Sequence, residues 1–334
     1  MIDDLLFSAN AVLPIILLIA LGYVLKRIGM LTGPFLDVGN KLTFRVLLPV
    51  MLFMNVYGIN SFSEINIWFV LYGMAAVIVI FAAAIPIYCA FTKDPAKRGS
   101  LMQSMFRSNY AIIGIPLAQS LFPENGAGAA AAAVMSAFCV PLFNVLAVVT
   151  LSIYNGNSTK SKIDVKKILL GIVKNPLIIG TVAGLAALGI RELLVLGNID
   201  WRLSDIEFLY TSLNNVKSIC TPFALIILGG KFEFSAVGRL KKEIIFGTFM
   251  RVVTVPVLGL LGAYLLMPLT GISGEHFATY IGVFGTPVAV ASAIMAKEMG
   301  ANADLAGQLV VWTSLISAVT IFIYVTILRS IGIF

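Results

Sequence analysis

The sequence consists largely of long apolar runs separated by short polar connections. Hydrophobic residues make up 59% of its 334 positions and charged residues only 12%, whereas about a quarter of a typical soluble domain is charged. A chain so poor in charge cannot cover a globular surface with polar groups, so a water-soluble enzyme is excluded. Because one helix needs roughly 20 apolar residues to cross a bilayer, the sequence predicts an all-α polytopic membrane protein.

Apolar runs of spanning length occur at ten places in the sequence. They lie near 5–25, 42–57, 67–91, 100–122, 127–153, 168–190, 208–230, 244–267, 277–297 and 305–328. The second run is short, and the seventh begins in the polar stretch 204–217, which is expected to form an interfacial helix leading into the span. The acidic start of the chain has no basic region, so the first run is interpreted as a true span and not a cleaved signal peptide.

The basic residues alternate from one side of the predicted spans to the other. Of the 23 Lys and Arg residues, 19 fall on alternate connections. Because cytoplasmic loops are enriched in Lys and Arg, these connections are expected in the cytoplasm, with both termini outside the plasma or inner membrane. The same pattern explains the net charge of +7 by anionic lipid at the cytoplasmic face, with no nucleic-acid partner.

Prolines recur at a nearly constant offset, which indicates an internal repeat. The matched pairs are Pro14 and Pro176, Pro49 and Pro222, Pro86 and Pro256, and Pro116 and Pro287, which are 162 to 173 positions apart. The basic connection 154–167 divides the chain into a first repeat, 1–153, and a second, 168–334. An odd number of spans in each repeat inverts one relative to the other, as is common in secondary transporters.

The fourth and ninth spans are each predicted to be interrupted at a Gly-x-Pro sequence, Gly114-Ile115-Pro116 and Gly285-Thr286-Pro287. Proline removes a backbone donor and glycine leaves helical geometry at little cost, so each helix is expected to unwind and restart at its proline, with Thr286 as a cap. If the breaks cross at mid-membrane, the exposed N–H ends favour an anion such as a carboxylate. A proline kink without a break is the alternative.

Several polar residues in the apolar runs are candidates for a binding site. Asn109 either binds a substrate carboxylate or holds the unwound backbone, and Arg251 either binds a carboxylate or snorkels to the interface. Arg107 and Arg45 are interpreted as topology signals. Further candidates, for which hydrogen bonding between helices is the alternative, are Asn55, Asn144, Gln119 and Ser292.

The sequence contains no recognisable metal, cofactor or catalytic motif. It has one histidine, His276, and three scattered cysteines, Cys89, Cys139 and Cys220, so neither a metal site nor a cofactor is expected. No Asp or Glu lies in the central third of any predicted span, which leaves no charged sodium site. Neutral oxygens such as that of Thr286 keep sodium coupling open.

The order and spacing of five motifs resemble those of the auxin efflux carrier family, and in particular its short prokaryotic members, the malate permeases. The motifs are Leu48-Pro49-x2-Leu52, Asn109-x4-Gly114-x-Pro116, Pro222-x2-Leu225 with Leu228-Gly229-Gly230, Arg251-x4-Pro256, and Pro287-Val-Ala-Val-Ala-Ser. The resemblance covers nearly the whole chain. In such a protein the loop between the halves is short, as 154–167 is here.

This resemblance implies ten helices in a homodimer, with helices 1, 2, 6 and 7 as the scaffold and helices 3–5 and 8–10 as a transport domain. It also implies an elevator movement that carries small organic anions, dicarboxylates such as malate or auxin-like monocarboxylates. It places Asn109, Gly114, Pro116 and Pro287 at the crossing. The alternatives are a sodium-coupled symporter of the bile-acid type and an intramembrane enzyme, for which no nucleophile or carboxylate pair is found.

Overall fold

The computed structural model describes residue 14 and residues 17–58, 66–122, 127–154, 165–232 and 234–333. In these residues the chain is helical, and one isolated bridge pairs two extended segments. The expected start of the first span, 5–13, and most of the connection 154–167 lie outside the described residues.

The helices follow one another with short connections. After a helix at 17–27 come α2 (Gly33–Leu42), α3 (Leu48–Tyr57), α4 (Ile67–Phe91), α5 (Pro95–Phe106), α6 (Ile115–Leu121), α7 (Ala127–Ile153), α8 (Val165–Val173), α9 (Pro176–Leu196), α10 (Glu207–Gly230), α11 (Phe234–Arg239), α12 (Lys241–Phe249), α13 (Val255–Thr270), α14 (Gly274–Tyr280), α15 (Val290–Glu298) and α16 (Ala303–Ser330).

Five helical stretches among the described residues are long and apolar enough to cross a membrane. They are Ile67–Phe91, Val134–Ile153, Pro176–Leu196, Lys241–Thr270 and Ala303–Ser330. All of them except Val134–Ile153 carry large exposed apolar side chains, which only lipid or another protein surface can cover. The protein is therefore a polytopic, membrane-embedded helical protein.

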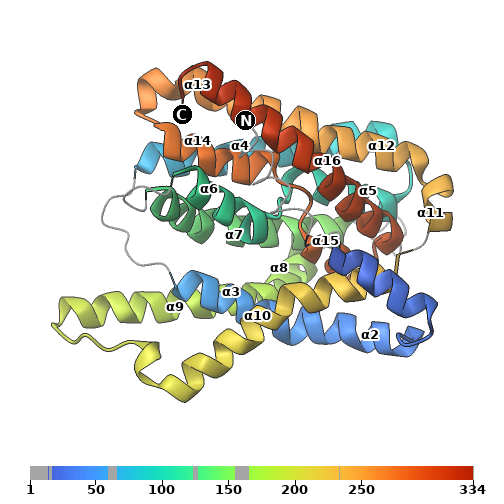
Figure 1. Ribbon diagram of the computed structural model, residues 1–334, viewed down its shortest axis with the longest axis horizontal. Coiled ribbons are helices and arrows are strands. Elements are labelled where there is room, and N and C mark those ends of the chain that lie inside the picture. The colour runs from blue at the N-terminus through green and yellow to red at the C-terminus, as the bar shows by residue number, and fades with distance from the viewer. Residues whose placement is uncertain are drawn as a thin grey trace.

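The helices form two groups that face each other. In Figure 1, α2, α3, α9 and α10 lie along the lower side, and α4 to α7 and α12 to α16 lie above them. Within the lower group α3 packs along α9, where Gly180 meets the backbone of Pro49 and Gly184 that of Phe53. Small residues at such contacts let membrane helices approach closely. We call α2, α3, α9 and α10, together with 17–27, the lower group.

Two expected boundaries were wrong. The second span is not short, because its helix begins at Gly33, where the side chain of Thr32 caps α2. The sixth does not begin at 168, because Asn175 accepts a hydrogen bond from the backbone of Leu177 and starts a new helix at Pro176. Most of the stretch 204–217 belongs to the helix α10, which continues into the seventh predicted span.

Four π turns each lie just before a proline. They are η1 (Thr43–Leu47), η2 (Tyr110–Gly114), η5 (Met250–Thr254) and η6 (Ile281–Gly285). A proline ring clashes with the carbonyl of the fourth residue before it, and a wider turn relieves the clash. In the first three turns, the residue before the proline donates to the carbonyl five positions back, as Val255 does to Met250.

These turns do not follow the matched proline pairs. Pro86 and Pro222, the partners of Pro256 and Pro49, lie inside the α-helices α4 and α10. Proline by itself therefore does not decide where the helical path changes.

The turn at η5 leaves one carbonyl to be satisfied from another helix. In an α-helix Val252 O would accept from residue 256, but Pro256 has no N–H, and the Tyr324 hydroxyl donates to this carbonyl at 2.7 Å. We expect Tyr324→Phe to lower stability by about 1–3 kcal/mol. The loss should shrink when Pro256→Ala restores the N–H. Thermal unfolding in detergent of wild type, the two single variants and the double variant measures this. An equal loss of stability in the presence and absence of Pro256 would contradict it.

Candidate functional site

The fourth and ninth spans are both interrupted, but not where their prolines predicted. In the fourth, α5 ends at Phe106 and the helical path resumes at Tyr110 with η2. In the ninth, η6 ends at Gly285 and α15 begins at Val290. The expectation that the helices restart at Pro116 and Pro287 was therefore wrong. Pro116 lies within the first turn of α6.

The two interruptions cross and pair with each other. Ser108 and Val288 form an antiparallel bridge. The N–H of Asn109 donates to Pro287 O at 2.8 Å, and that of Ala289 donates to the carbonyl of Arg107 at 3.1 Å. Backbone outside a helix is tolerated at membrane depth only where the protein satisfies it, and here each break satisfies the other.

The bridge does not align the two matched prolines of these spans. The paired residues Ser108 and Val288 are 180 positions apart, whereas Pro116 and Pro287 are 171 apart. The two prolines are consequently not equivalent: Pro287 lies in the break, and Pro116 follows it.

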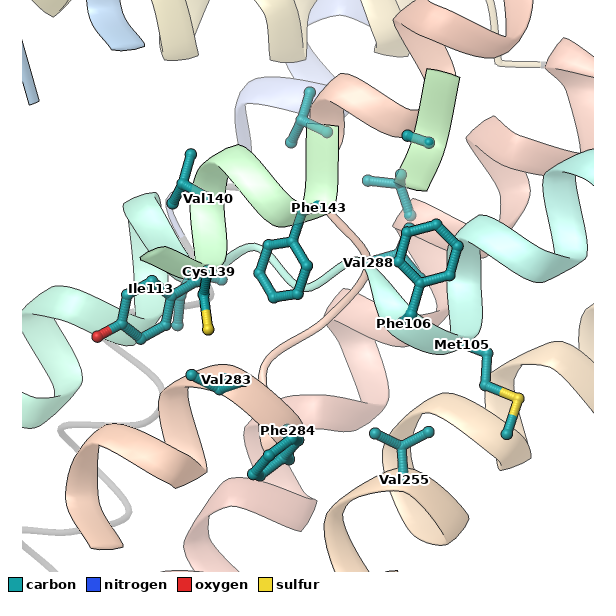
Figure 2. Packing of buried hydrophobic residues seen from close by; sticks show 14 of the residues in the cluster. Met105, Phe106, Ile113, Cys139, Val140, Phe143, Val255, Val283, Phe284 and Val288 are labelled. Carbon is teal, nitrogen blue, oxygen red and sulfur yellow. The ribbon is translucent and has the colours of Figure 1, made fainter. Parts of the chain in front are cut away.

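Beyond the bridge, the two interrupted helices contact each other through glycines. Gly114 and Gly282 face each other, and a Cβ on Gly282 would lie 2.8 Å from Gly114 Cα. Here α6 packs against α14. Gly114 thus permits the close approach of the two interrupted helices and does not line a cavity. Figure 2 shows the apolar side chains of Phe106, Phe143 and Val288 close to one another in the core.

The side chain of Arg251 is fully buried against the ends of both interrupted helices. Its Nε donates to Thr286 O at 2.8 Å, Nη1 to Met105 O at 3.1 Å and Nη2 to Val283 O at 3.1 Å. All three acceptors are main-chain carbonyls. The full burial shows that the expectation of snorkelling was wrong, whereas carboxylate binding by Arg251 stays a prediction.

Thr286 also differs from its expected role as a cap of the restarted helix. Its buried hydroxyl donates to the carbonyl of Gly282 at 2.7 Å, so it completes the end of the preceding half-helix. The residue before α15 is Ala289, which makes no side-chain cap.

A small cavity, about 60 Å³, lies on the other side of the crossing from Arg251. This space holds a few waters or a small polar group. Both restarted helices open into it, through residues 109–112 and 289–291, and its remaining wall comes from α3, α7, α9 and α10. The first N–H groups of a helix have no partner within it, and Asn109 makes no side-chain cap either. The cavity therefore lies at two positive helix ends.

Arg107 brings a buried positive charge to this cavity. It is only 3% exposed. Its Nη2 donates to Asn144 Oδ1 at 2.7 Å and its Nη1 to Gln103 Oε1 at 3.0 Å. No carboxylate among the described residues pairs with it. The interpretation of Arg107 as a topology signal was wrong, because a charge buried among neutral partners is costly unless a ligand compensates it.

Two further buried groups of the cavity have no partner among the described residues. They are Nδ2 of Asn144 and the hydroxyl of Ser108. An amide N–H, a hydroxyl, a guanidinium and two helix N-termini are all donors. Such a set suits an anion with several acceptor oxygens, such as a carboxylate.

The structure brings some of the expected residues together and leaves others apart. Asn109 and Asn144 line the cavity. Asn55 is half-buried on α3, Gln119 is exposed on α6, and neither lines it. Ser292 is buried in the first turn of α15, and its hydroxyl has no partner within the described part of the chain. The side chain of Pro116 is outside the described part.

Sequence reasoning missed Arg107 and Ser108 as cavity residues. The available signal was the polar triplet Arg107-Ser108-Asn109, which interrupts an apolar run well before its proline.

A helical membrane protein with two interrupted helices crossing beside a mostly apolar cavity that contains a few polar groups has the architecture of a membrane transporter. A family model described as membrane transport protein matches residues 7–325, and the chain belongs to this family, that of the auxin efflux carriers. The resemblance drawn from the motifs is thereby confirmed. The search of curated proteins finds no match. Members of the family are transporters, so the protein is a membrane transporter of a small molecule.

The glycine contact at the crossing yields a stability prediction. We expect Gly282→Ala to destabilise the protein by about 1–3 kcal/mol, because the added methyl group would overlap the backbone of Gly114. Gly189→Ala on α9 is the matched control, since nothing lies within 4 Å of its Cβ position. The midpoint of thermal unfolding measures both. A Gly282→Ala variant as stable as the control would contradict the close approach.

Proposed function

We propose that the protein is a secondary carrier of small organic anions, dicarboxylates such as malate or auxin-like monocarboxylates, which bind in the cavity beside Arg107. The observation that carries this proposal is the buried guanidinium of Arg107, whose partners are neutral, next to the unpaired donors of Asn144 and Ser108. No metal, cofactor or catalytic group takes part.

Charge decides between an anion and other solutes. Arg107 and the two helix N-termini all raise the positive potential in the same small cavity, and none of the residues lining it is acidic. A carboxylate that accepts hydrogen bonds from these groups gains about 1.5–3 kcal/mol per charged bond. A cation placed there would be repelled.

The distribution of polar groups over the cavity wall supports an elevator movement. Asn144 lies on α7, and Arg107, Ser108 and Asn109 form the break that follows α5. Both α5 and α7 lie above the lower group in Figure 1. The lower group contributes mainly apolar side chains, with Thr221 as its only hydroxyl. A ligand held by one group against an apolar wall of the other can move with the first group when the two slide.

We also propose how the protein lies in the membrane and how it assembles. Ten spans in two inverted repeats would place the basic connections in the cytoplasm and both termini outside the cell membrane. The apolar outer faces of the lower group, for example Leu193 and Leu196 on α9, would contact lipid or a second copy in a homodimer.

Sodium-coupled symport receives no support from the break in the ninth span. The carbonyls of Val283 and Thr286, which could have held sodium, accept hydrogen bonds from Arg251. A guanidinium at this distance opposes a bound cation.

Counterflow in proteoliposomes tests the carrier function directly. Vesicles loaded with unlabelled malate, or in parallel with indole acetate, receive the labelled acid outside, with and without sodium. A carrier transiently accumulates the label above equilibrium, while a channel only equilibrates it. Absence of exchange for both acids would contradict the proposal, and formation of a product from a lipid or peptide would indicate an enzyme.

The role of Arg107 leads to a prediction on binding. We expect Arg107→Gln to weaken binding of the transported acid about 10- to 100-fold, because it removes charged hydrogen bonds worth about 1.5–3 kcal/mol. Calorimetric titration of the purified protein measures this. Arg45→Gln is the control, since the same change is made at an exposed position. Unchanged affinity in Arg107→Gln would remove Arg107 from the site.

The contact between Arg107 and Asn144 leads to a second prediction. Asn144→Asp keeps the shape of the side chain but places a carboxylate 2.7 Å from the guanidinium. We expect the pair to occupy Arg107 and abolish anion binding at neutral pH without lowering the unfolding temperature. Asn144→Ser, which adds no charge, should bind more weakly than wild type but measurably. Wild-type affinity in Asn144→Asp would contradict an anion at this position.

A further inference from the structure

Arg251 is the one large charged group at the crossing that the cavity does not use. It lies on η5, between α12 and α13, and no residue of these three elements lines the cavity. Its element packs instead against α5 and η6, the halves of the two interrupted helices that end at the crossing. It is fully buried, and no carboxylate among the described residues pairs with it.

Two of its three acceptors are carbonyls that the crossing itself has left without a helical partner. In an α-helix each carbonyl accepts from the N–H four residues later. The partner of Val283 O would be residue 287, which is a proline. The partner of Met105 O would be Asn109, whose N–H donates across the bridge to Pro287 O instead. The guanidinium of Arg251 donates to both vacated carbonyls, and to Thr286 O within the break.

This arrangement joins the two interrupted helices through one rigid group. The guanidinium is planar and holds its donors in a fixed geometry, so the three carbonyls it binds keep fixed positions relative to one another. Its charge also suits the negative C-terminal ends of both half-helices. Met105 and Thr286 lie only a few residues before Tyr110 and Val290, where the helices restart. Fixing the carbonyl ends of the first half-helices therefore also fixes the N-terminal starts of the second half-helices.

The local sequence explains why Arg251 reaches this position. Pro256 widens the preceding turn, in which the N–H of Val255 donates to Met250 O, and Arg251 is the second residue of that turn. The motif Arg251-x4-Pro256 thus has a structural meaning, since its proline shapes the turn that presents its arginine.

We propose that Arg251 is a positioning residue of the anion site. By tying the carbonyl ends of both interrupted helices together, it holds the two N-terminal ends at the spacing with which they face one carboxylate in the cavity. This proposal rests on the proposed function, because it assumes that the cavity binds an anion. Arg251 itself does not touch the ligand.

The test compares Arg251→Gln and Arg251→Lys with wild type and with Tyr324→Phe. The last variant removes a hydrogen bond from the same turn but none from the crossing, so it controls for a general loss of stability. Three quantities are measured: the dissociation constants for malate and indole acetate, the midpoint of thermal unfolding, and the hydrogen exchange of the Asn109 and Ala289 amides, which form the bridge.

We expect Arg251→Gln to bind both acids about 10- to 100-fold more weakly, which is the loss found for groups that orient the ligands of a metal ion. We also expect the amides of Asn109 and Ala289 to exchange faster in this variant. Arg251→Lys should be intermediate, because an ammonium lacks the planar fork. Tyr324→Phe should be less stable but bind like wild type.

Wild-type affinity and exchange in Arg251→Gln would overturn the proposal, as would a larger loss for malate than for the monocarboxylate, which would indicate direct contact. If Arg251→Gln does not fold, the same comparison is made with Arg251→Lys. If wild type binds neither acid, the proposed function fails for these substrates. The exchange measurement then decides on Arg251 alone, because unchanged bridge amides would overturn its role.

Discussion

Backbone polar groups that leave a helix inside a membrane must be satisfied by the protein itself, and the rest of this structure depends on how two such stretches satisfy each other. Arg107 to Asn109 and Thr286 to Ala289 pair as a short antiparallel bridge. In this pairing the backbone carbonyl of Pro287, which has no N–H, accepts a hydrogen bond from the N–H of Asn109. In a continuous helix this N–H would donate to Met105 O. The carbonyl of Met105 therefore needs another donor.

The crossing separates two kinds of helix end. The carbonyl ends meet the guanidinium of Arg251 on one side, and the N–H ends open into a cavity with Arg107 on the other. Because the negative ends already have a cation, the positive ends are left for a ligand. This arrangement supports the proposal that the cavity binds an anion, and the charged and amide groups of the cavity wall, Arg107, Asn109 and Asn144, all lie outside the lower group.

The apolar runs, the class of protein, the family and the existence of two interruptions could all be predicted from the sequence, because they follow from composition and local backbone rules. The exact positions of the interruptions could not. The backbone rules for proline are local, and a π turn accommodates Pro116 within its helix. The break lies instead at Arg107-Ser108-Asn109, which pairs with a segment about 180 residues away in the sequence. The positions of the two buried arginines could not be predicted for the same reason. Depth in a span can be read from a sequence, but whether Arg107 or Arg251 faces the cavity depends on which helices pack together.

The most direct test of this account is to locate a bound anion that carries a heavy atom. A crystal of the protein soaked with bromosuccinate, analysed by the anomalous signal of bromine, would show where the dicarboxylate lies. We expect the bromine in the cavity between the crossing and α3, with a carboxylate within hydrogen-bonding distance of Arg107 and Asn144. Bromine bound elsewhere, or a carboxylate bound to Arg251 with the cavity empty, would contradict it.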